Sequence, residues 1–139
     1  METIRRLKRL AEHKERMAKI DLSRAEHERM VQQQILDTHT ATLASVLASR
    51  PIDAEDARQR HAYALQVELT RRSAERTLFE RQRQAGLKRE ALIGEARERR
   101  TWEIAEENRM NEAKAEAERR LRATLDQIGL DIWWRGNRP

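Results

Sequence analysis

Residues suited to a helix interface recur along the first third of the chain at steps of three and four, the spacing of a helix that buries one face. A step of four from Ala18 to Leu22, directly after the four-residue step from Lys14 to Ala18, predicts a stutter that would locally unwind a supercoil. The first series is Ile4, Leu7, Ala11, Lys14 and Ala18, and the second is Leu22, Ala25, Arg29, Gln32, Leu36, His39, Leu43 and Val46.

Alanine dominates a similar series in the rest of the chain. Small side chains let two helices approach closely but bury little apolar area. Helices of the expected length need a partner along their length. The series is Ala57, His61, Ala64, Leu78, Ala85, Leu92, Ala96, Met110, Ala113, Ala117 and Thr124.

Proline and glycine divide the chain only once before its C-terminal part. Pro51 is the only proline before the last residue, and no glycine precedes Gly86. Since these residues are the strongest interruptions of a helix, the sequence predicts a helix over 2–49, a turn over 50–53 and a second helix over 53–128.

The ends of the second helix have their own signals. Asp53 is the expected N-cap, because its carboxylate can accept a hydrogen bond from the first turn. Gly129 is the expected C′ glycine, which would leave a C-terminal tail over 129–139. Gly86 and Gly94 lie inside the helix and predict local softness rather than a break.

A short turn folds two such helices against each other. We therefore expect an all-α fold, an antiparallel two-helix coiled-coil hairpin that forms one elongated rod over residues 1–139. Pairing by symmetry about residue 51 places residue 2 opposite residue 100. The second helix would then overhang near 101–128 with no partner in the monomer, which makes this segment the first candidate binding surface.

Composition agrees with an elongated helical protein. Of the 139 residues, 38% are charged and only 26 are Leu, Ile, Val or Phe, too few for a spherical core. The absence of cysteine excludes disulfides and thiolate metal sites. No apolar run is long enough to span a membrane or act as a secretory signal, so we expect a cytoplasmic protein without direct membrane insertion.

The net charge of +5 is unevenly placed. Residues 1–20 hold 7 basic and 3 acidic groups, residues 97–139 hold 10 and 9, and the residues between them sum to zero. The expected hairpin is thus basic at its open end, which can steer it towards an acidic partner surface.

The sequence contains no pattern typical of an active site. Its histidines, His13, His27, His39 and His61, are never four residues apart, and carboxylate pairs such as Glu106 and Glu107 lie on helix surfaces. There is no glycine-rich phosphate loop and no Ser/His/Asp arrangement. We therefore expect no enzyme activity, no metal site and no cofactor.

Arginine outnumbers lysine 24 to 5, which raises the question of nucleic-acid binding. Acidic residues are interleaved with these arginines, whereas a nucleic-acid helix usually has a continuous basic face. Arginine pairs equally well with carboxylates of a protein partner. We expect a protein partner and no nucleic acid, with a basic nucleic-acid-binding rod as the weakest alternative.

Trp133 and Trp134 follow Ile132 in a chain with only five aromatic residues. Two interpretations remain open. The tail can fold back and cover the overhang, or the tryptophans can anchor in a partner pocket.

Part of the second helix resembles a known family. The segment Leu92–Glu103, followed by Glu107, Glu112-Ala113, Glu118-Arg119-Arg120 and Leu125-Asp126, resembles the C-terminal helix of the FliJ/YscO-like stalk proteins of type III export. The resemblance covers about residues 50–130. It implies an antiparallel two-helix coiled coil.

The resemblance also implies a function: a soluble central stalk or escort component of a flagellar or virulence-type export apparatus, cytoplasmic and peripheral to its membrane-embedded part. Its implied partners are a hexameric export ATPase, the membrane export-gate protein and export chaperones. Tyr63 and Leu65 are the implied gate-facing residues. The arginines that the resemblance places at the ATPase end are Arg5, Arg6, Arg9, Arg119, Arg120 and Arg122.

An alternative function follows from the overhang alone. A structural coiled-coil adaptor, or a chaperone-like escort, could dimerise through this segment and bind unrelated partners. A monomeric rod favours the stalk, whereas a tight homodimer favours the adaptor.

Overall fold

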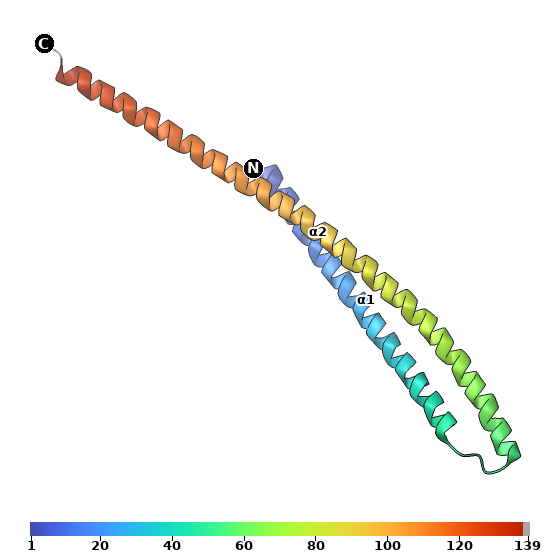
Figure 1. Ribbon diagram of the computed structural model, residues 1–139. Coiled ribbons are helices and arrows are strands. Elements are labelled where there is room, and N and C mark those ends of the chain that lie inside the picture. The colour runs from blue at the N-terminus through green and yellow to red at the C-terminus, as the bar shows by residue number, and fades with distance from the viewer. Residues whose placement is uncertain (138–139) are drawn as a thin grey trace. The chain divides into compact units, whose positions relative to one another are not determined.

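The structure, a computed structural model, describes residues 1–137 and is all-helical over that range. It contains two helices, α1 (Glu2–Ala48) and α2 (Ala54–Gly136), which run in opposite directions and pack against each other (Figure 1). The expected all-α helical hairpin is therefore confirmed. The last two residues of the expected C-terminal tail lie outside the described residues.

The turn between the helices is closed by two reciprocal hydrogen bonds. The Asp53 carboxylate accepts a bond from the backbone N–H of Asp56 at 2.7 Å, and the Asp56 carboxylate accepts one from the N–H of Ile52 at 2.8 Å. Both bonds satisfy donors that a helix start or turn would otherwise leave to water. The predicted N-cap at Asp53 is confirmed.

The predicted end of the second helix at residue 128 is wrong, because α2 continues through Gly129 to Gly136. No glycine in the described chain has a positive φ, so Gly129 takes the ordinary helical conformation instead of turning the chain. The helix ends where Asn137 donates two hydrogen bonds to the carbonyl of Trp133, from its backbone N–H at 3.0 Å and from Nδ2 at 2.9 Å. Asn137 therefore provides the cap expected at Gly129.

The chain divides into two compact units, and each is described by itself. The larger unit spans Lys14–Glu95, and the smaller unit joins Met1–His13 to the chain from Ala96 onward. In the larger unit, the parts of α1 and α2 next to the loop lie side by side (Figure 1). Its buried apolar residues are small or medium in size: Ala25, Ala64, Val67, Ala74, Leu78 and Ala85. The predicted alanine-rich interface is confirmed there.

The register of α1 differs from the prediction by one residue at the start of the larger unit. Glu15 is buried, with only 8% of its surface exposed, whereas Lys14 is exposed. From Glu15 through Ala18, Leu22 and Ala25 the steps alternate between three and four, so the extra four-residue step lies at Ala11–Glu15, directly after Leu7–Ala11, and not at Ala18–Leu22. A charged residue occupies the interface here, which a count of apolar residues does not detect.

Polar contacts join the two helices of the larger unit. Gln32 Nε2 donates to the carbonyl of Ala74 at 3.4 Å, and the Arg81 guanidinium lies 3.1 Å from the Glu28 carboxylate. Arg89 pairs with Glu26 in the same way. These long side chains reach across the alanine-rich interface, where apolar contacts alone would be sparse.

In the smaller unit, the N-terminal segment of α1 packs on α2 further along than symmetry about residue 51 predicts. Lys8 Nζ lies 3.4 Å from the Glu106 carboxylate, and Met1 lines a groove with Arg109 and Ala113. The expected overhang over 101–128 is therefore wrong at its N-terminal end.

Candidate partner-binding surfaces

The exposed part of α2 in the smaller unit begins later and ends later than expected. Every residue over 116–137 is exposed, and we call this range the C-terminal segment. Met110, Leu121, Leu125, Ile128 and Ile132 share one face of the helix, since their spacings are close to whole numbers of turns. This apolar face is exposed to solvent.

The C-terminal tip, residues 130–136, carries large apolar side chains on more than one side of the helix. Trp133 and Trp134 are 58% and 63% exposed, and their rings meet edge to face with centroids 5.5 Å apart. Each residue of an α-helix is rotated by about 100° from the one before, so Ile132, Trp133 and Trp134 project to three different sides, and Leu130 shares a side with Trp134. The tip is therefore apolar on every side except the one that Asp131 and Arg135 occupy.

In the structure the tail does not fold back over the rest of α2, as one of the two interpretations required. Residues 130–136 continue α2, and both tryptophans remain exposed. The tip is free to contact a partner in this conformation.

The three candidate arginines near the N-terminus lie on the first turns of α1. Arg6 Nε is 3.6 Å from the Glu2 carboxylate, and both side chains are exposed. Within residues 1–137, Arg5 and Arg9 form no salt bridge. An exposed pair such as Arg6–Glu2 contributes little to stability, so these guanidiniums are available to a partner.

The other three candidate arginines lie on the C-terminal segment. Arg119 and Arg120 both pair with Glu116, at 2.8 and 3.2 Å, whereas Arg122 has no salt bridge in the described part of the chain. Helix geometry turns Arg120 and Arg122 to opposite sides. The structure brings Arg119 into the groove that Met1 lines, but it does not gather the six arginines into one basic patch.

Tyr63 and Leu65 belong to the larger unit, on the first turns of α2. Each is about half exposed, and they lie on either side of the buried Ala64. Because Tyr63 and Leu65 are two residues apart on a helix, their side chains point in nearly opposite directions. The structure therefore does not bring them together on one surface.

Leu65 instead belongs to a set of exposed positions that sequence reasoning did not group together. Their steps of three and four repeat those of the packed interface, but they lie on the face of α2 away from α1. Because three arginines interrupt the apolar positions, a search for regularly spaced apolar residues does not detect the pattern. We call this set the outer stripe: Leu65, Leu69, Arg72, Arg76, Phe79, Arg83 and Leu87.

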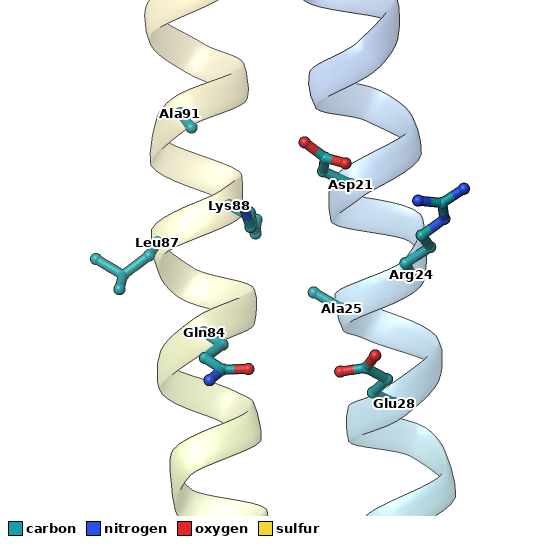
Figure 2. A pocket seen from close by; sticks show the side chains of 8 residues that line it. All are labelled: Asp21, Arg24, Ala25, Glu28, Gln84, Leu87, Lys88 and Ala91. Atoms are coloured by element: carbon teal, nitrogen blue, oxygen red, sulfur yellow. The ribbon is translucent and has the colours of Figure 1, made fainter.

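A groove also opens between the helices of the larger unit, with a volume of about 540 Å³. Figure 2 shows Ala25 facing across it and Leu87 pointing away from α1. Asp21 and Lys88 are among its lining residues. Among residues 1–137, no three His, Asp or Glu side chains are placed to hold a metal ion.

No helix in the described part of the chain is long and apolar enough to cross a bilayer. Comparisons with protein-family models, curated proteins and solved structures give no match.

Proposed function

We propose that this protein is a soluble, cytoplasmic stalk component of a type III protein export apparatus, which engages a hexameric export ATPase ring and the membrane export gate. The observation that carries the proposal is the C-terminal tip, which is apolar on every side except that of Asp131 and Arg135. A helix with exposed large apolar residues on most of its sides is normally enclosed. Such a tip fits a socket, as at the centre of a ring, better than a flat surface.

Charge on the C-terminal segment supports the same partner. Arg119, Arg120 and Arg122 project to different sides of a single helix, so acidic groups arranged around it could each meet a guanidinium. Arg5, Arg6 and Arg9 would add basic charge in the same unit and accelerate encounter with an acidic ring.

The proposed mechanism requires no active site in this chain. An asymmetric helix in a symmetric ring contacts the ring's subunits differently and so stabilises some of their conformations over others. Tyr63 and Leu65 would lie on the part that meets the export gate, and export chaperones are further proposed partners.

The test is the turnover of a purified export ATPase at saturating concentrations of this protein. We expect turnover to rise several-fold, and the double variant W133A/W134A to remove most of the increase. Ile52→Ala, which truncates an exposed apolar residue of the turn, is the matched control and should behave like the wild type. Unchanged turnover at saturation would refute the proposal.

A structural adaptor is the second candidate, favoured by the exposed apolar face from Met110 to Ile132. Two copies could bury this face against each other, as in other coiled coils. Sedimentation equilibrium separates the two: a mass near 16.4 kDa supports the stalk, whereas a tight dimer that L125E dissociates supports the adaptor.

A further inference from the structure

The outer stripe of α2 is an apolar feature of the larger unit that α1 leaves uncovered. Leu65, Leu69, Phe79 and Leu87 are between 55% and 69% exposed, more than most large apolar residues of α1. Figure 2 shows the Leu87 side chain directed away from α1. Exposed apolar side chains that repeat along one helix face are typical of an interaction surface.

The charged positions within the stripe all have one sign. Arg72, Arg76 and Arg83 alternate with the apolar residues, and none of the seven stripe positions is Asp or Glu. Arg72 pairs with Glu68 at 3.0 Å and Arg83 with Glu80 at 3.8 Å, both beside the stripe. In residues 1–137, Arg76 forms no salt bridge.

A shallow groove of about 500 Å³ lies next to Phe79. It is lined by Phe79 together with Glu68, Arg71, Arg72, Glu75 and Arg76. Glu68 and Glu75 already pair with Arg71 and Arg72. Arg76 is therefore the guanidinium beside Phe79 that can pair with a carboxylate of a partner.

We propose that the outer stripe binds an acidic amphipathic helix of another protein. The stripe repeats at the spacing with which helices pack side by side, and its 23 residues extend over about 33 Å at 1.5 Å per residue. Apolar residues of the partner pack against Leu65, Leu69, Phe79 and Leu87. Its carboxylates pair with the three arginines between them.

The inference rests on residues 65–87, shares only Leu65 with the proposed export-gate contact, and goes beyond the proposed function. An export ATPase that responds to the C-terminal tip says nothing about the outer stripe. Conversely, a stripe that binds no acidic helix leaves the role of the tip unchanged. The two proposals therefore fail separately.

The test uses the full chain and two designed helical peptides of equal length. One carries leucine at the contact positions and glutamate beside them, and the other has lysine in place of each glutamate. Fluorescence anisotropy of the labelled peptides gives Kd. We expect the acidic peptide to bind at least tenfold more tightly than the basic one, with an affinity that falls as salt rises.

Variants locate the binding on the stripe. Phe79→Ala and Arg76→Glu should each weaken acidic-peptide binding about tenfold while circular dichroism stays unchanged, because both side chains are exposed. Arg16→Glu, which reverses an exposed arginine on α1 of the same unit, should change Kd by less than twofold.

Several results would overturn the proposal. Equal binding of the two peptides would remove the preference for acid, and equal effects of R16E and R76E would reduce it to net charge. Self-association of the chain that F79A abolishes would make the stripe an interface between two copies. Tighter binding to anionic vesicles than to the peptide, lost in R76E, would identify a lipid surface instead.

Discussion

The larger unit and the C-terminal segment use the same helix, α2, in opposite ways. In the larger unit, α2 buries small residues, including Ala64, Ala74 and Ala85, against α1. In the C-terminal segment it carries bulkier side chains, among them Leu121 and Trp134, and buries none of them.

The difference shows that side-chain size does not decide burial in this protein. Alanine permits close helix packing but gives little transfer free energy, on the order of 25 cal/mol per Å² of apolar surface removed from water. Much of the large apolar area is exposed, on the outer stripe and the C-terminal segment. This distribution is typical of a protein whose main apolar contacts are with partners.

The largest expected difference in stability between the two regions comes from truncating a leucine in each. Leu78→Ala deletes a buried leucine of the larger unit, and we expect a loss of about 2–3 kcal/mol in the free energy of unfolding. Leu125→Ala deletes an exposed leucine of the C-terminal segment and should change it by less than about 0.5 kcal/mol. Urea unfolding followed by circular dichroism at 222 nm measures both.

Equal losses in the two variants would mean that the C-terminal segment is covered in solution, for example by a second copy. Measuring Leu125→Ala at two protein concentrations distinguishes these cases, because only an oligomer becomes more stable as concentration rises.

The elements that sequence predicts correctly depend on local chemistry. Pro51 interrupts the helix, and Asp53 caps the next one. In each case the interacting groups are within one turn of each other, so their geometry follows from the helix itself.

The elements that sequence misses depend on the partner helix or on competing local conformations. Glu15 is buried instead of Lys14 because the extra four-residue step falls between Ala11 and Glu15, at a charged position that an apolar pattern does not mark. Gly129 was expected to end α2, but glycine permits a left-handed turn without requiring one. The outer stripe was missed because arginines occupy three of its seven positions.

Glycines offer a second, smaller test of the two regions. A Cβ added at Gly86, Gly94 or Gly129 would meet no atom within 4 Å. Replacing glycine by alanine inside a helix should therefore stabilise it by about 1 kcal/mol per site. We expect G86A and G94A to raise the urea midpoint of the hairpin.

Gly129→Ala is the matched variant in the C-terminal segment. It should increase the helical signal without moving that midpoint, since this segment packs on nothing in the described chain. If G86A gives no gain, the chain needs the conformational freedom of glycine at that position, and the helix there is less regular than the structure shows.

Acid titration gives the smallest effect and bears on the larger unit alone. Hydrogen bonds from Arg71 and Arg72 lower the pKa of Glu68 from 4.5 to about 2. A carboxylate whose pKa is lowered by folding contributes stability above its ordinary pKa, and this contribution is lost as the pH falls from about 4.5 to about 2. Glu68→Gln should therefore be less stable than the wild type at pH 7 and equally stable below pH 2.

Glu118→Gln removes a carboxylate from the C-terminal segment and controls for net charge, because Glu118 forms no salt bridge within residues 1–137. Thermal unfolding at a series of pH values gives the difference between each variant and the wild type. A Glu68→Gln difference that stays constant from pH 7 to pH 2 would show that the Glu68 carboxylate does not titrate with these arginines. Ion pairs along α2 would then contribute no more to the larger unit than exposed charges do in the C-terminal segment.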